Sequence, residues 1–211
     1  MNTNTWDARN LFTAEIIVSS LEPSNPIDAI MFFTRAESDD DHLFEIVAKA
    51  LHTGLARYVI LNRSDGRGMG DLPGKAWPGV DIYLTRLSSL GVSKDKVLLS
   101  EEARDTREED TEYLEVALQH KFKSVAVLTQ PHQILRATLG LVKEMSRRSQ
   151  FLQVYCLTPR STNWNKKVWG SQSREFKLRQ EHIDDEYSRI IKYATQGDLP
   201  QPNEFFAYFS S

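Results

Sequence analysis

The sequence has little of several features that mark specialised classes of protein. Cys156 is the one cysteine among 211 residues, which excludes a disulfide within the chain and a zinc site of several cysteines. Ten glycines and eight prolines are too few for collagen or low-complexity sequence. No apolar run approaches the roughly 20 residues of a membrane span, and residues 1–15 lack the pattern of a signal peptide. We therefore expect a cytoplasmic protein with no membrane span.

The sequence also lacks a large excess of either positive or negative charge. The 26 Lys and Arg residues face 29 Asp and Glu residues, giving a net charge of −3. A protein that coats nucleic acid needs a basic surplus, so this balance argues against that class. The chain holds no Walker A segment, no Gly-x-Ser-x-Gly elbow and no His-Glu-x-x-His, and its acidic residues are too dispersed for metal-ligand spacing. We expect a small-molecule ligand and no metal.

What the sequence does have is a regular alternation of short apolar runs with helical patterns. Parallel strands buried on both faces read as continuous apolar runs, and strands that alternate with helices form βαβ units. The pattern predicts an α/β fold, a three-layer Rossmann-like sandwich around a mostly parallel five-stranded sheet. The five runs are residues 29–34, 58–61, 96–99, 124–128 and 151–157.

The chain reads as one domain over residues 1–211. Residues 1–27 look like an N-terminal appendage, residues 28–197 form the core, and residues 198–211 look like a C-terminal tail. A last helical pattern runs from Phe176 to Ala194 after a polar loop. Cys156 lies inside the fifth apolar run, so we expect a buried and inert thiol.

In a doubly wound sheet, ligands bind beyond the carboxyl ends of the strands, so the loops after the apolar runs hold the candidate site. The loop after the second run contains Ser64, Asp65, Gly66 and Gly68. Closely spaced glycines let backbone N–H groups approach an anion, although they do not follow the first strand as the dinucleotide fingerprint requires. This loop is either an anion-binding loop or an ordinary surface loop.

Acidic residues follow the third run. Asp105 and Glu108 fit a capping box at the start of the next helix. Capping does not explain Glu101, which follows the strand directly and is placed to hold a ribose hydroxyl, a metal ion or a proton. The alternative is a solvated acidic start of the helix.

The loops after the fourth and fifth runs carry basic groups. His132 stands in the first turn of a predicted helix, a place suited to acid–base chemistry or to phosphate contact, and Arg136 follows one turn later. Arg160 follows the fifth run and is a candidate anion contact. Each of these residues also fits an ordinary surface or packing role.

The order of these segments resembles the YdcF-like branch of the SanA/ElyC/YdcF group, a family of unknown function. In the matching segments, Thr106, Glu108, Thr129 and Arg136 fall on the family's Thr, Glu, Thr and Arg. His132 stands three residues after Thr129, where the family has four. The segments that carry the resemblance are residues 26–30, 90–99, 101–108, 129–137 and 197–202.

The resemblance implies a Rossmann-like fold, and YdcF-type members are linked to binding S-adenosylmethionine. This cofactor is accordingly an expectation for the chain. The departures from the family pattern, such as the shifted histidine, leave open whether the protein is an enzyme.

Two hypotheses follow for the function. The first is a protein that binds a nucleotide-like or phosphorylated small molecule, with Glu101 as ribose or metal acceptor, Arg136 as anion contact and His132 as general acid or base. The second is a non-catalytic interaction protein with a degenerate site, whose acidic segment 101–115 docks a basic partner. The full candidate set of the first hypothesis is Ser64, Asp65, Gly66, Gly68, Glu101, Thr106, Glu108, Thr129, His132, Arg136 and Arg160.

Overall fold

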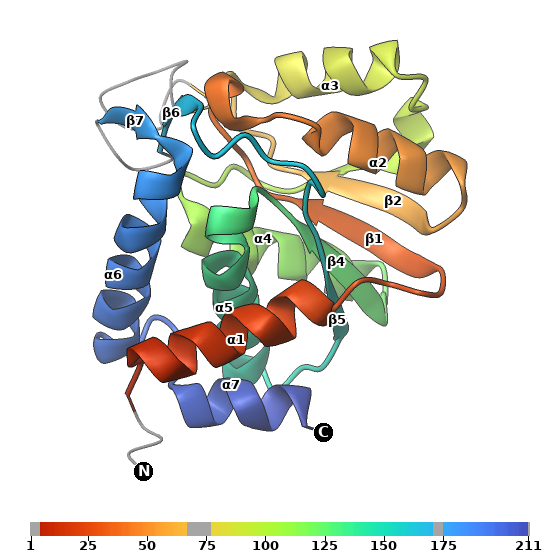
Figure 1. Ribbon diagram of the computed structural model, residues 1–211. Helices are drawn as coiled ribbons and strands as arrows, with labels where there is room; N and C mark the ends of the chain where they lie inside the picture. Colours follow the sequence, from red (N-terminus) through yellow and green to blue (C-terminus); the bar gives the residue numbers. More distant parts are fainter. Residues whose placement is uncertain (1–4, 67–76, 171–174, 211) are drawn as a thin grey trace.

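A computed structural model describes residues 5–66, 77–170 and 175–210 (Figure 1). It confirms the predicted fold class, with one five-stranded sheet in which all the strands are parallel. The strands are β1 (Ile27–Phe32), β2 (Ala56–Leu61), β3 (Val97–Leu99), β4 (Ser124–Leu128) and β5 (Gln153–Leu157), in the order β3-β2-β1-β4-β5.

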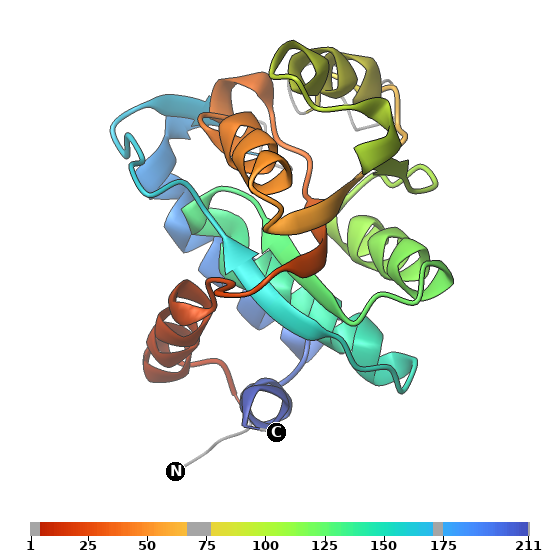
Figure 2. The same ribbon diagram turned by 90° about the vertical axis from the view of Figure 1, so that its right-hand side faces the viewer.

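Helices cover both faces of this sheet, as Figure 2 shows. Ile30 and Phe32 of β1 pack with α2 and α3, whereas Ala29 and Met31 pack with α4 and α5 on the other face. Both sets of side chains are buried, which is why the strands read as continuous apolar runs. The helices are α2 (Leu43–His52), α3 (Val80–Ser89), α4 (Thr106–Gln119) and α5 (Pro131–Arg147).

The helix boundaries follow from local sequence signals. Asp105 caps α4 by accepting hydrogen bonds from the backbone N–H groups of Arg107 (2.9 Å) and Glu108 (3.0 Å). Pro131 occupies the first turn of α5, where its missing N–H group costs nothing. The two helices therefore begin directly beyond β3 and β4, and their first turns lie at the carboxyl edge of the sheet.

Central strand β1 is the point where the strand order reverses. Chain order runs outward through β2 and β3 on one side of β1, and through β4 and β5 on the other. The loops after β1 and β4 therefore lead to opposite faces of the sheet, and the place between them is the usual ligand position in this fold. We call this place the switch point.

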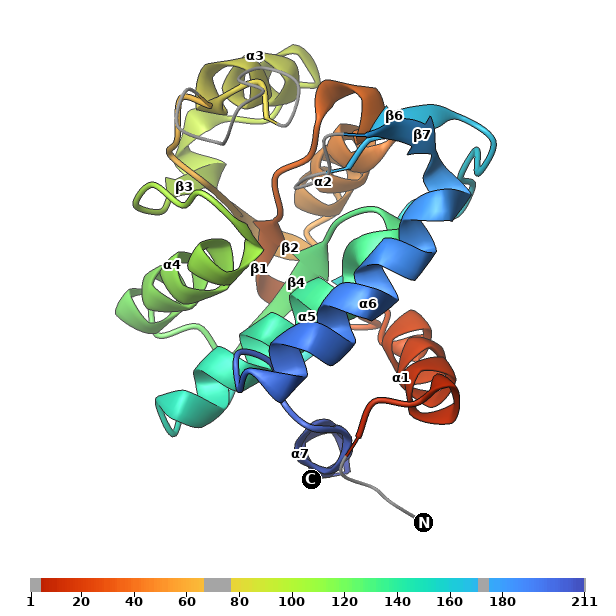
Figure 3. The ribbon, with the colours of Figure 1, turned by 90° about the vertical axis from the view of Figure 1, so that its left-hand side faces the viewer.

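The N-terminal and C-terminal segments pack against the core of the fold. Helix α1 (Ala8–Ser20) packs against α5 and β5, and α7 (Pro202–Phe209) packs against α5. Trp6 joins them, because its Nε1–H donates to the carbonyl of Pro200 (2.9 Å) and its ring meets Phe205 edge-on. Figures 1 and 3 show α1 and α7 at the end of the molecule away from the switch point.

A short antiparallel hairpin lies where the sequence predicts a polar loop. Strands β6 (Lys167–Trp169) and β7 (Phe176–Leu178) form it, and α6 (His182–Thr195) follows. The predicted helix from Phe176 is therefore wrong in its first turns, since Phe176 pairs with Trp169 in the hairpin. Three-residue strands are too short to show a period of two.

The described residues also contain the 3₁₀ turns η1 (Glu37–Asp39), η2 (Lys94–Lys96) and η3 (Arg179–Glu181). Within the described ranges, the longest apolar helical stretches fall short of what a membrane crossing requires. Cys156 is buried as expected, and burial raises the pKa of its thiol to about 12.

The anchoring of α1 gives a stability prediction. Trp6→Ala removes a buried ring and leaves the Pro200 carbonyl unpaired, so we expect a loss of about 3–5 kcal/mol in the free energy of unfolding. Phe12→Ala on α1 is the control, because Phe12 is 66% exposed and its loss should change this free energy by less than about 0.5 kcal/mol. Urea unfolding measures both variants. A loss below about 1 kcal/mol for Trp6→Ala would show that α1 contributes little to the fold.

Candidate functional site

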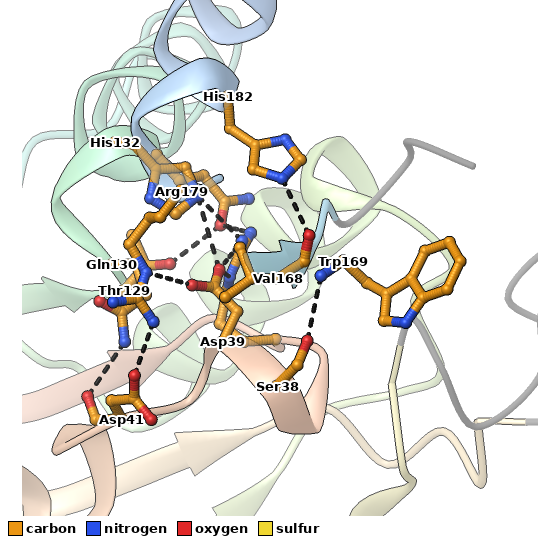
Figure 4. Close-up of polar contacts among 12 residues, drawn as sticks. Ser38, Asp39, Asp41, Thr129, Gln130, His132, Val168, Trp169, Arg179 and His182 are labelled. Atoms are coloured by element: carbon orange, nitrogen blue, oxygen red, sulfur yellow. Dashed lines mark hydrogen bonds and ion pairs between the residues drawn. The ribbon is translucent and has the colours of Figure 1, made fainter. Parts of the chain in front are cut away.

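The switch point is filled by a buried polar cluster from three separate parts of the chain. Its members are Arg35 and Asp39 after β1, His132 and Gln133 in the first turn of α5, and Arg179 in η3. We call these five residues the switch-point cluster. Figure 4 shows Asp39, His132 and Arg179 converging there, with His182 beside them. Each of the five side chains is at most 5% exposed.

One carboxylate holds two arginines in this cluster. Arg35 donates from Nε (2.9 Å) and Nη2 to Oδ2 of Asp39, and Arg179 donates from Nε to Oδ1 (2.8 Å). Arg179 also donates to the carbonyl of Asn163 (3.0 Å) and to Oδ2 of Asp41 (2.7 Å). Buried guanidinium groups need such partners, because an unpaired charge away from water costs several kcal/mol.

Gln133 connects Arg35 to the end of strand β4. Gln133 Oε1 accepts hydrogen bonds from Arg35 Nη1 and from the hydroxyl of Thr129 (3.0 Å). Its Nε2 donates to the hydroxyl of Thr106 (3.3 Å) at the start of α4. A line of hydrogen bonds therefore runs from the end of β4 to the first turn of α4.

His132 is neutral in this environment. Burial, together with the neighbouring charge of Arg35, lowers the pKa of the imidazole well below its usual value. Because Arg35 Nη2 lies 3.1 Å from Nε2 and has only protons to offer, Nε2 accepts and the ring proton belongs on Nδ1. Nδ1 is buried and has no partner among the described residues. The ring therefore presents a buried donor whose acceptor is missing.

Four cationic side chains meet the three aspartates of segment 39–41. Arg35 and Arg179 share Asp39, Arg179 and Lys166 share Asp41, and Arg86 pairs with Asp40. Burial raises the pKa of Asp40 to about 6, although Arg86 opposes the shift. Burial alone would raise the pKa of Asp41, but hydrogen bonds from Arg179 and Lys166 lower it. The positive end of the α5 helix dipole points to the same place, so the switch point favours an additional negative charge.

A second buried layer lies beneath the cluster. Glu109 Oε1 accepts from the backbone N–H of Thr34 (2.9 Å), and the hydroxyl of Tyr113 donates to the carbonyl of Phe32 (2.8 Å). Burial raises the pKa of Glu109 to about 7 despite its hydrogen bonds to Thr34. These side chains of α4 hold the end of β1 and so position the loop that carries Arg35.

The candidate residues of the first hypothesis are only partly brought together. His132, Thr129, Thr106 and Arg136 lie on adjoining parts of the structure, whereas Glu101 is 71% exposed and pairs with Arg63 (3.3 Å). Glu101 follows β3 and His132 follows β4, and these strands are three positions apart in the sheet. With about 4.8 Å between neighbouring strands, their ends are separated by roughly 14 Å.

The remaining candidates have local roles in the described structure. Ser64 is buried and its hydroxyl accepts from the N–H of Gly66 (3.2 Å), while Asp65 is exposed. Glu108 accepts from the N–H of Arg104 (2.7 Å) at the start of α4. Arg160 is 86% exposed and pairs with Glu22 (3.1 Å). Gly68 lies outside the described residues.

Arg136 is buried and already paired. Its guanidinium donates to the carboxylate of Glu186 on α6, and Glu186 also accepts from Arg189 (2.6 Å). Burial would raise the pKa of Glu186, but the charge of Arg136 lowers it. Arg136 and Thr106 both line a pocket of about 140 Å³ between α4, α5 and α6, which borders the switch-point cluster because Gln133 donates to Thr106.

Comparison with known proteins does not assign the chain to a family. A scan against protein-family models finds no match, and a search of curated proteins finds none either. The likeness to the YdcF-like branch remains a resemblance carried by short segments. Across the described residues, no three His, Cys, Asp or Glu side chains gather as metal ligands would.

The sequence reasoning missed most of the switch-point cluster. Arg35 had a usable signal, because it directly follows the first apolar run, residues 29–34. Gln133 stands four residues after Thr129, one helical turn away, and its side chain reaches the centre of the cluster. Arg179 had no signal, because it lies 140 residues from Asp39 in a segment without clear periodicity.

The acidic segment also differs from its predicted role. The second hypothesis treats Glu109 and Asp110 as part of a docking surface, but the two side chains are 2% and 1% exposed. They face the sheet and α5, because α4 turns that side of the helix toward the core. Charge reversal at either residue would therefore disrupt the fold and report nothing about a partner.

The raised pKa of Glu109 gives a prediction about pH. The folded state holds this proton more tightly than the unfolded chain, whose Glu has its ordinary pKa of 4.5. The stabilisation is therefore full below about pH 4.5 and is lost as the pH rises through about 7. Relative to Glu109→Gln, the wild type should lose roughly 3 kcal/mol between about pH 4 and pH 8, at about 1.4 kcal/mol per pKa unit.

Urea unfolding at several pH values measures this difference. Glu112→Gln on the same helix is the control and should keep the pH dependence of the wild type. Parallel curves for the wild type and Glu109→Gln would contradict the assignment of a protonated Glu109.

Proposed function

We propose that the protein binds a small anionic molecule, phosphorylated or nucleotide-like, at the switch point of the sheet. The observation that carries the proposal is the sharing of one carboxylate, Asp39, by two fully buried arginines. Arginine forks match the oxygens of phosphate and carboxylate groups. Asp39 therefore holds the position that a ligand anion would take.

Three further features support an anion at this position. The N-terminus of the 17-residue helix α5 is directed to it, and no side chain caps that end. His132 presents a buried Nδ1 without a partner among the described residues, and an Nδ1–H there would donate to an anion. The location is also the one at which doubly wound sheets bind their ligands.

The resemblance to the YdcF-like branch adds one specific ligand to the proposal. S-adenosylmethionine carries a carboxylate that the same two arginines are suited to hold, and its adenosine is nucleotide-like. A cytoplasmic location belongs to this proposal as well. The proposal does not include catalysis, because the exposed Glu101 and the buried His132 are not brought to one place.

A second candidate is the non-catalytic interaction protein with a degenerate site. One observation favours it, since Arg35, Arg136 and Arg179 each already have a carboxylate partner. A site that has replaced its ligand by internal ion pairs would have this appearance. On this view the exposed acidic residues of segment 101–115, such as Glu101 and Glu102, are the ones to reverse in a partner-binding assay.

A ligand panel distinguishes the two candidates. Thermal unfolding is measured with ATP, ADP, AMP, inorganic phosphate and S-adenosylmethionine. A ligand present at about 100 times its Kd should raise the Tm by about 5–10 °C for a chain of this size. Arg35→Gln should abolish the rise, because it removes one arm of the anion site.

Arg57→Gln is the matched control, since Arg57 is 63% exposed and pairs with Asp28 at the other end of the sheet. It should keep the full rise in Tm. If Arg35→Gln does not fold, Lys166→Gln replaces it, because this side chain is partly exposed and should weaken binding without loss of the fold. A wild type that responds to none of the ligands would overturn the proposal and favour the interaction protein.

A further inference from the structure

Helices α1 and α6 form one outer face of the molecule. Both pack against α5, and Figure 3 shows the two helices next to each other on this face. The hydroxyl of Tyr187 on α6 forms a hydrogen bond with the carboxyl of Glu15 on α1, which joins the neighbouring sides of the two helices. The outward side of each helix is exposed.

An apolar patch lies on this face. Phe12 and Ile16 of α1 are 66% and 53% exposed, and Ile191 of α6 is 45% exposed. Phe12 stands three residues before Glu15, and Ile191 stands four residues after Tyr187, so both flank the contact between the helices. Three of the seven large apolar side chains that are exposed among the described residues therefore lie on this one face. A contiguous apolar patch is typical of interaction surfaces, unlike single exposed apolar residues.

The carboxyl of Glu15 does not prevent this patch from being covered. Burial raises its pKa to about 7, although the hydrogen bond with Tyr187 opposes the shift. Near neutral pH a large share of the molecules therefore carry the uncharged form, which costs less to remove from water than a carboxylate.

The charges beside the patch are complementary to themselves. Asp184 and Lys192 are exposed and stand four residues to either side of Ser188 on α6. The other carboxylates in the body of this helix already form ion pairs within the chain. Asp184 and Lys192 form no ion pair with any described residue. One acid and one base therefore remain free on the outward side of α6, symmetrically placed about its middle.

We propose that this face binds a second copy of the chain, with the two α6 helices antiparallel across a twofold axis at Ser188. Asp184 of each copy then faces Lys192 of the other, so the contact contains two equivalent ion pairs beside the joined apolar patches. A twofold contact needs only one surface, because the same patch serves both copies. A different partner with charge of one sign would attract one of the two side chains and repel the other. This inference does not depend on the anion site proposed above.

Sedimentation velocity of the full-length protein measures the association. The wild type should pass from the 24.2 kDa monomer to a dimer with a Kd in the micromolar range. Ile191→Glu should weaken the dimer at least about tenfold, because it places a charge in an apolar contact. Ile82→Glu is the matched control and should leave the Kd unchanged, since Ile82 is 42% exposed on a different helix, α3. The stability of Phe12→Ala is measured below this Kd, where the protein is a monomer.

A charge exchange tests the antiparallel arrangement. Asp184→Lys alone and Lys192→Asp alone should each weaken the dimer about tenfold, because each places like charges opposite each other. The double variant with both substitutions should regain the Kd of the wild type. The substituted side chains are exposed, so the variants should keep the fold, which circular dichroism verifies.

Three results would overturn the proposal. The first is a wild type that stays monomeric at about 200 µM, well above the Kd of a weak specific contact. The second is a dimer that Ile191→Glu leaves intact, and the third is a double variant that associates no better than the single variants. None of these results affects the ligand panel for the switch point.

Discussion

The bridge from Arg35 through Asp39 to Arg179 is the interaction on which the carboxyl edge of the sheet depends. It joins the loop after β1 to a 3₁₀ turn 140 residues later in the chain. Through it the β6–β7 hairpin is held over the switch point, where Trp169 also donates its backbone N–H to Ser38 (3.0 Å). Figure 4 shows the indole of Trp169 directed away from the cluster, so the backbone makes this contact. Removing one partner of such a buried network leaves the others without compensation, which gives the bridge its importance.

The same bridge has both a structural and a functional interpretation. Buried ion pairs are weak sources of stability, because desolvation offsets much of the attraction between the charges. Two arginines, an uncapped helix N-terminus and an unpartnered imidazole donor are more than is needed to fix a loop. We propose that a ligand anion competing with Asp39 accounts for their concentration at the switch point.

Much of the fold was predictable from the sequence. Physical reasons explain which elements could be predicted and which could not. The parallel sheet follows from strands such as 124–128, whose side chains are buried on both faces and therefore apolar throughout. Asp105 and Pro131 mark helix starts by local chemistry. The hairpin was missed because its strands are three residues long. Residues 8–20, within the segment expected as an N-terminal appendage, form a helix that packs against α5 and β5.

The candidate site was harder to predict because it depends on strand order. The rule that ligands bind at the carboxyl edge drew attention to Thr129 and His132, which lie at the switch point, but it also drew attention to Glu101, three strand positions away. Only the order of the strands in the sheet decides which loops meet. Arg179 enters the cluster from a segment that local sequence cannot place, and Gln133 was masked by the more conspicuous histidine beside it.

The most direct test of the anion site is a crystal structure of the protein grown with ADP. We expect phosphate oxygens within hydrogen-bonding distance of Arg35 and Arg179, at the N-terminus of α5, with the Asp39 carboxylate displaced from between the two guanidinium groups. A crystal structure with Asp39 still bridging both arginines, and ADP absent or bound elsewhere, would contradict the account.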